Sequence, residues 1–269
     1  MRLDKALLIA RKDWREAFSS RAMLASLLFC GLMLVVLPPL MLVPLALAPD
    51  VGQYMTEKEV AELKAILPEA AQMDMRQLLA YMVGALLTPF FFIIVSLVSI
   101  SVLASDSFAG EKERKTIEPL LAAPISDSEL FLGKVLASFL PSSAITYASF
   151  ALSCVLINSL TADLFGGLWF PPLKTLLAVC LLAPAYAFLG MCLIVLGSAR
   201  ASTVKEASNY SGVLIIPVLV AFLGSIFGGI ALRASYIVVA TLAVVALDVV
   251  LVRMARRAFN REALVLSYR

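Results

Sequence analysis

The sequence contains no histidine, and only 15% of its 269 residues are charged. Histidine is the commonest metal ligand and the side chain that titrates nearest to neutral pH, so its absence removes the usual metal centres and general bases. Four cysteines are present without Cys-x-x-Cys spacing, and this argues against a disulfide or zinc framework. We expect no metal site, no enzyme active site and no nucleic-acid partner.

Long apolar stretches dominate the rest of the chain. The sequence is 61% hydrophobic with a mean hydropathy of +0.95, whereas soluble domains are roughly 45–50% apolar. A helix that crosses the roughly 30 Å hydrocarbon core needs about 20 residues. Six stretches reach that length, and they cover residues 22–48, 78–105, 135–161, 175–199, 211–232 and 234–252.

These stretches predict an all-α polytopic membrane protein in which residues 1–269 form a single transmembrane domain of six spans. The last two stretches are separated by Arg233 alone. One span with a re-entrant tip over residues 211–252 is therefore the alternative at this end.

The distribution of basic residues predicts the orientation. Seventeen of the 22 Lys and Arg residues lie in the N-terminal 21 residues, in the segments 106–134 and 200–205, and in the tail 253–269. Basic residues in short loops are retained on the cytoplasmic side. We expect both termini to be cytoplasmic and the protein to lie in the inner, or cytoplasmic, membrane.

Two segments outside the spans have helical patterns. Residues 1–21 form an amphipathic helix that we expect at the membrane interface, with one apolar face of Leu3, Ala6, Leu7, Ala10, Trp14, Ala17 and Phe18. Residues 49–77 form the one sizeable exoplasmic loop, in which a capping box of Thr56 and Glu59 starts a short helix.

The polar segment 106–134 follows the second span. Thr116 is suited to cap a new helix, Glu118 lies in its first turn where the helix dipole favours an anion, and Pro119 is tolerated there. Pro124 ends this helix after two turns at most. The pattern predicts a short helix outside the bilayer.

The same segment carries an exposed apolar pair and a second capping box. Leu120 and Leu121 stand among charged residues and must be covered by headgroups or by a partner protein, while Ser126 and Glu129 form the box that starts the third span. A solvated connector is the alternative.

The run from Glu111 to Ser126, Glu-Lys-Glu-Arg-Lys-Thr-Ile-Glu-Pro-Leu-Leu-Ala-Ala-Pro-Ile-Ser, followed by Gly133-Lys134, resembles the signature of the type-2 permeases of ATP-binding-cassette (ABC) transporters. Sodium-exporter and multidrug-exporter permeases belong to this family. The ending Phe259-Asn260-Arg261-Glu262 is also similar, and so is the plan of an N-terminal helix, six spans and a loop between spans two and three.

The resemblance implies that segment 106–134 holds a cytoplasmic coupling helix, which docks on a separate ATPase subunit. The coupling residues it implies are Glu111, Glu113, Arg114, Thr116, Glu118, Leu120, Leu121 and Pro124. It also implies two ATPase subunits and a second permease, either another copy or a related chain. Gly133-Lys134 lacks the flanking residues of a phosphate loop, so we expect ATP and Mg²⁺ to bind to the partner.

Polar residues inside the spans are the remaining candidates. Thr88, Phe92, Ser96 and Ser99 share one face of the second span, for which the resemblance implies the translocation path, although serine and threonine often bond back to their own helix. Gly224 and Gly228 form a helix-packing motif. Asp248 is an intramembrane charge for which we favour a structural pair with Arg253 over an ion relay.

These observations favour the permease subunit of an ATP-driven exporter. Because few charges lie in the spans, the expected substrate is an amphiphile such as a drug, lipid or peptide, or an ion such as sodium. The alternative is a secondary transporter or a membrane assembly factor that uses no ATP.

Overall fold

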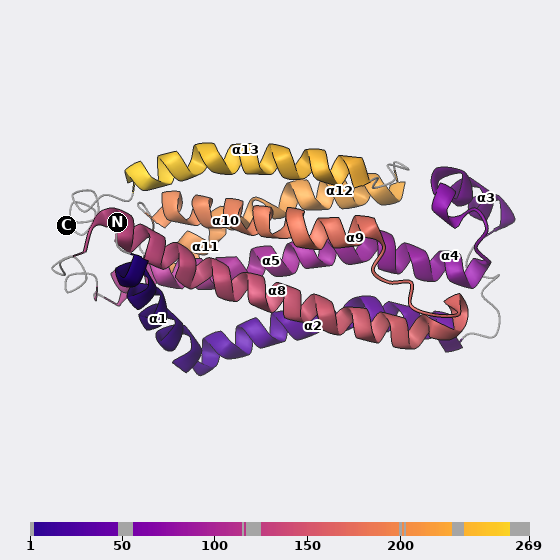
Figure 1. Ribbon diagram of the computed structural model, residues 1–269, viewed down its shortest axis with the longest axis horizontal. Coiled ribbons are helices and arrows are strands. Elements are labelled where there is room, and N and C mark those ends of the chain that lie inside the picture. Colours follow the sequence, from indigo (N-terminus) through magenta and orange to yellow (C-terminus); the bar gives the residue numbers. More distant parts are fainter. Residues whose placement is uncertain are drawn as a thin grey trace.

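The computed structural model describes residues 3–47, 56–114, 116, 125–198, 201, 203–227 and 234–258. In these residues the chain is helical apart from short turns and loops, and no strand occurs. Figure 1 shows an elongated bundle whose long helices run nearly parallel, with α1 at an angle at one end and α3 at the other. The all-α prediction is confirmed.

Six helical segments are long and apolar enough to cross a membrane, as predicted. They cover Met23–Leu42, Met75–Glu113, Asp127–Phe165, Leu173–Ser198, Val204–Ser225 and Ala234–Arg256. The last two are separate helical segments, each long enough to cross on its own, which favours two spans over a re-entrant tip.

The helices that build these spans are α2 (Arg21–Leu47), α4 (Met75–Tyr81), α5 (Thr88–Ser105), α8 (Asp127–Phe165), α9 (Leu173–Leu177), α10 (Ala183–Ser198), α11 (Val204–Gly212), α12 (Ile215–Phe227) and α13 (Ala234–Ala258). Three π-helical stretches join them: η3 (Met82–Leu87), η5 (Ala178–Leu182) and η4 (Asp106–Gly110). Pro89 and Pro184 follow η3 and η5 closely. Each proline lacks a backbone N–H, and its ring crowds the carbonyl four residues earlier, so the regular series of α-helical hydrogen bonds is disturbed there.

Helix α5 is the centre of the bundle. It packs against α8, α10, α2 and α11, and two thirds of its span, 67%, is buried, against 11% for the span of α13. The largest apolar cluster joins Ile100 and Phe108 with Phe131 of α8 and Met191 of α10. Helix α13 lies at the rim with most of its side chains outward.

The N-terminal helix α1 (Leu3–Ser19) divides the predicted apolar face in two. Ala6, Ala10 and Ala17 are buried on the side that packs against α8, while Leu3 and Phe18 are 61% and 44% exposed. Small residues allow α8 to approach, and the large residues Leu3 and Phe18 remain exposed.

The opposite end of the bundle holds α3 (Glu57–Ile66), the 3₁₀ turn η2 (Pro68–Ala70) and a loop between α8 and α9. The short helix predicted in this loop region is present. Trp169 of the α8–α9 loop stacks on Phe165 with ring centroids 4.3 Å apart. Asn158 accepts hydrogen bonds from the backbone N–H groups of Trp169 and Phe170.

Candidate functional site: a charged junction beside a cavity

Four consecutive side chains, Glu111 to Arg114, connect the end of the second span to different parts of the bundle. Glu111 begins the short helix α6 (Glu111–Glu113) and is only 4% exposed. Its carboxylate lies 2.8 Å from the Lys134 ammonium of α8 and 2.9 Å from that of Lys12 in α1. The signature residues Glu111 and Lys134 are therefore partners in one buried ion pair.

Asp13 completes this cluster from α1. Its carboxylate accepts a 2.7 Å hydrogen bond from Ser107 and lies 3.8 Å from the Lys134 ammonium, and Lys134 also donates to the Ser107 carbonyl. Burial raises the pKa of Asp13, while Lys134 and Ser107 act in the opposite direction. We call Lys12, Asp13, Ser107, Glu111 and Lys134 the charge cluster.

Lys112 and Glu113 bind the ends of two other helices. Lys112 donates a 2.8 Å hydrogen bond to the Ser198 carbonyl at the end of α10. Glu113 accepts a 2.8 Å hydrogen bond from the Val204 N–H at the start of α11. A cation at a helix C-terminus and an anion at an N-terminus satisfy free backbone groups and complement the helix dipoles.

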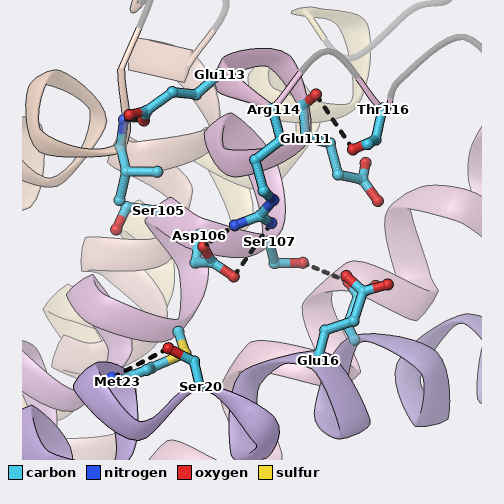
Figure 2. A network of polar contacts seen from close by, with 12 residues as sticks. Glu16, Ser20, Met23, Ser105, Asp106, Ser107, Glu111, Glu113, Arg114 and Thr116 are labelled. Atoms are coloured by element: carbon cyan, nitrogen blue, oxygen red, sulfur yellow. Dashed lines mark hydrogen bonds and ion pairs between the residues drawn. The ribbon is translucent and has the colours of Figure 1, made fainter.

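Arg114 and Thr116 turn the chain back onto the second span. Arg114 donates a 2.8 Å hydrogen bond to Asp106, eight residues earlier. The Thr116 N–H donates to the Glu111 carbonyl at 2.9 Å, and its hydroxyl reaches the same carbonyl at 3.5 Å. Figure 2 shows Arg114 pointing down to Asp106 and Thr116 pointing to the backbone of Glu111. We call residues 111–114 the clasp.

Gly133 brings α1 close enough to complete the charge cluster. A Cβ atom at this position would lie 2.7 Å from the Ile9 Cβ and 2.9 Å from the Ala6 carbonyl oxygen. Both distances are shorter than van der Waals contact, so only glycine permits this crossing. The Gly-Lys pair of the signature thus combines a close helix contact with a buried cation.

The predicted capping box at the start of α8 is confirmed. The Ser126 hydroxyl accepts from the Glu129 N–H, and the Glu129 carboxylate accepts from the Ser126 N–H. The predicted coupling residues Glu118, Leu120, Leu121 and Pro124 lie outside the described residues.

A cavity of about 1760 Å³ opens beside the clasp. Its walls come from α1 and α2, from α5 with the clasp, and from α11 and α12. It is lined by Lys12, Arg15, Glu16, Ser19, Ser20, Met23, Ser26, Leu97, Val98, Ser101, Val102, Ser105, Asp106, Glu113, Arg114, Thr116, Thr203, Val204, Lys205, Ser208, Gly212 and Ile215. We call it the α1–α5–α11 cavity.

The four predicted path residues do not line this cavity. Thr88, Phe92, Ser96 and Ser99 are at most 1% exposed, on the side of α5 that packs against α8 and α10. Ser96 donates to the Ala183 carbonyl, Phe92 meets Phe150 edge to face, and Thr88 bonds to its own helix. The cavity lies against a different face of α5, with Val98, Ser101, Val102 and Ser105.

The two other intramembrane candidates lie away from the clasp. Gly224 is partly buried in α12, and Gly228 lies outside the described residues. Asp248 is 6% exposed in α13, and one of its carboxylate oxygens has no hydrogen-bond partner. Arg253 is exposed, and the described part of the chain shows no ion pair between these two residues.

Sequence reasoning missed Asp13 and Ser107. Asp13 falls between the small residues of the α1 face that packs on α8, and a carboxylate in an apolar helix face signals a buried partner. That signal was present in the sequence. Ser107 shows no pattern that separates it from the neighbouring serines.

Comparison with known proteins identifies the family. No curated protein matches the chain. The profile described as "ABC-2 family transporter protein" matches residues 7–238, which cover most of α1, the clasp, α8 and all but the last part of the bundle. The chain belongs to the ABC-2 family, and it is a multi-pass membrane permease subunit of an ABC transporter.

Proposed function

We propose that this permease serves an ATP-driven exporter and is coupled to a separate ATPase subunit through segment 106–134. The observation that carries the proposal is the clasp. Glu111 binds both α1 and α8. Lys112 binds the end of α10, and Glu113 binds the start of α11. A displacement of the segment is therefore passed to four helices at once.

The coupling residues then fall into two groups. Glu111, Glu113, Arg114 and Thr116 transmit movement, since each of them contacts another group of the bundle. These partners are Lys12 and Lys134 for Glu111, the Val204 N–H for Glu113, Asp106 for Arg114 and the Glu111 carbonyl for Thr116. Glu118, Leu120, Leu121 and Pro124 lie in the stretch that we propose to dock on the ATPase. The first group holds the segment, and the second group receives the force.

The proposed assembly contains two ATPase subunits, which bind ATP and Mg²⁺, and a second permease, either a further copy or a related chain. The end that carries the clasp faces the cytoplasm of the cell's inner membrane, together with both termini. The substrate is an amphiphile such as a drug, lipid or peptide, or an ion such as sodium. The apolar walls of the α1–α5–α11 cavity support an amphiphile.

Docking is tested by replacing Leu120 and Leu121 with serine together. Burial of each leucine contributes about 1.5–3 kcal/mol, so the double variant should weaken the ATPase complex by about two to four orders of magnitude. The measurements are co-purification of the ATPase and ATP-driven transport. The matched control replaces Leu168 and Leu173 with serine. These residues are 88% and 65% exposed at the opposite end, and the control should retain both the ATPase and transport.

Transmission is tested separately with Glu113→Ala, which removes the acceptor for the Val204 N–H and leaves the docking stretch intact. We expect the ATPase to co-purify normally, while transport per ATP hydrolysed falls.

If the double leucine variant still exports and keeps its partner, segment 106–134 is a solvated connector. The secondary transporter or assembly factor then becomes the better explanation.

A further inference from the structure

The α1–α5–α11 cavity changes from charged to apolar along two of its walls, that of α5 and that of α11 and α12. On α5 the lining passes from Asp106 and Ser105 to Val98 and Leu97. On the wall of α11 and α12 it passes from Lys205 to Gly212 and Ile215. The charged residues all lie at the end that carries the clasp, and the apolar residues lie deeper in the bundle.

The depth of this gradient corresponds to one leaflet of a bilayer. From Leu97 to Asp106 the helix rises roughly 13 Å at 1.5 Å per residue, and half of a hydrocarbon core is roughly 15 Å. A molecule in this cavity therefore meets charge and then hydrocarbon at the depths at which a lipid does.

Two cations at the mouth have no acidic partner among the residues that the structure describes. The charges around them are engaged: Arg114 binds Asp106, Lys12 lies 2.9 Å from Glu111 and 3.5 Å from Glu16, and Glu113 accepts from a backbone N–H. Arg15 on α1 and Lys205 on α11 are exposed on opposite walls, and neither forms an ion pair within the described part of the chain.

We propose that this cavity binds an amphiphile with an anionic headgroup, whose headgroup lies between Arg15 and Lys205 and whose apolar chain lies along Val98, Val102 and Ile215. That this amphiphile is the cargo rests on the proposed export function. The geometry explains why the mouth keeps, above an apolar wall, two positive charges that no described residue compensates.

Gly212 provides a way to fill the cavity without disturbing the fold. It lines the cavity, and a Cβ atom added there would meet nothing within 4 Å. Gly212→Trp therefore introduces a large side chain into open space, and removal of a glycine also favours the helix. Gly212→Ala is its matched control, because it adds a Cβ atom and leaves the space free.

The test uses the purified permease and its ATPase complex in phosphatidylcholine nanodiscs. Binding of fluorescently labelled phosphatidic acid, compared with labelled phosphatidylcholine, is measured first without ATP. Arg15→Gln with Lys205→Gln should weaken phosphatidic acid binding about tenfold. Arg11→Gln with Arg253→Gln removes two exposed charges outside the cavity and should leave it unchanged. Gly212→Trp should weaken the binding of both lipids, and Gly212→Ala should weaken the binding of neither lipid.

Three outcomes would overturn the site. Wild-type affinity in the Arg15 and Lys205 double variant would remove the headgroup position. Displacement of the probe by inorganic phosphate as readily as by unlabelled phosphatidic acid would indicate an ion site. A Gly212→Trp variant that separates two permease copies without weakening lipid binding would show that the cavity is an interface.

ATP is then added to the assembled complex, and release of the probe is measured. Binding that follows the expected pattern without ATP-driven release keeps the site and contradicts the export function. A complex that assembles and hydrolyses ATP, but binds no anionic probe, contradicts the site and leaves the export function standing.

Discussion

The two ends of the bundle are held together by different forces. At the end that carries the clasp, Lys134 is 2% exposed and is surrounded by the carboxylates of Glu111 and Asp13. At the opposite end, Trp169 stacks on Phe165, and Asn158 fixes the loop through backbone hydrogen bonds. One end is built on a cluster of buried ions, whereas aromatic packing dominates the other, where a single buried lysine, Lys174, pairs with the exposed Glu69.

Under the coupling that we propose, this difference separates a transmitting end from an anchoring end. A buried ion cluster acts as a unit, because removal of one member leaves another charge buried without compensation. Aromatic packing and satisfied backbone hydrogen bonds depend on local contacts alone. We therefore expect a signal that enters at the clasp to reach α1, α8, α10 and α11 together, while the opposite end stays fixed.

The largest expected effect concerns the side of the membrane on which each end lies. In a cysteine-free variant, single cysteines at Glu62 or Asp163, both exposed at the aromatic end, should react with a membrane-impermeant maleimide in intact cells. A cysteine at Ser128, exposed near the clasp, should react only after the cells are opened. The basic residues gathered at that end are the physical reason.

Labelling of Ser128→Cys in intact cells would reverse the orientation. It would also place the clasp outside the cell, where no ATPase can reach it. Reaction of all three cysteines after permeabilisation is the control for their chemical accessibility.

Two buried lysines allow a direct comparison of the ends. Lys134→Met leaves the carboxylates of Glu111 and Asp13 buried, and we expect a loss of about 3–5 kcal/mol in the free energy of unfolding. Lys174→Met removes a lysine that is 5% exposed, but its partner Glu69 is 64% exposed and returns to water, so this loss should be no more than about 1 kcal/mol from the ion pair. Unfolding in detergent, followed by circular dichroism, gives both values.

A second variant separates charge from packing. Lys134→Met combined with Glu111→Met removes an ion pair instead of one ion, and Lys12 still lies 3.7 Å from Asp13. The double variant should be more stable than Lys134→Met alone. Equal stability of the two would mean that Lys134 acts through its packing and that the charge cluster does not behave as a unit.

The spans and the start of α8 were predictable from sequence because hydropathy and capping are local properties. The six spans and the Ser126 capping box needed no knowledge of distant residues. The end of the second span was not predictable in this way. Its helical segment runs to Glu113 instead of ending at Ser105, because Lys12 and Lys134 compensate Glu111 inside the protein, and a hydropathy window records the charge without its partners.

The path residues illustrate a second limit. The regular spacing of Thr88, Ser96 and Ser99 shows that they share a face of α5, but it does not show what covers that face. In the centre of a bundle every face has a neighbour, and this one packs against α8 and α10. Only the three-dimensional arrangement separates it from the face at the cavity.

A smaller effect tests how closely α1 must approach α8 at the charged end. Gly133→Ala places a Cβ atom 2.7 Å from Ile9 Cβ, and we expect a loss of about 1–3 kcal/mol from overpacking. Gly212→Ala makes the same chemical change in α11 with nothing within 4 Å, and it should be neutral or stabilising by up to about 1 kcal/mol. Thermal unfolding of the two variants gives the difference, and equal midpoints would contradict the close crossing of α1.

The smallest effect is a difference in how the ends respond to acid. A hydrogen bond from Tyr81 and the nearby Lys174 lower the pKa of Glu69 below its ordinary 4.5, although burial opposes them. Its contribution is complete above about pH 4.5 and is lost as the pH falls from there through the lowered value. Burial raises the pKa of Asp13, so its ionised form costs stability at neutral pH, and this cost disappears as the pH falls through the raised value.

The stability difference between the wild type and Glu69→Gln should therefore shrink only in acid below about pH 4.5, whereas Asp13→Asn should change the pH dependence at higher pH. The loss at Glu69 should be no more than about 1 kcal/mol, because its carboxylate is mostly exposed. Unfolding measured from pH 7 to pH 3 gives both curves, and parallel curves for the two variants would mean that the ends do not differ in their response to protons.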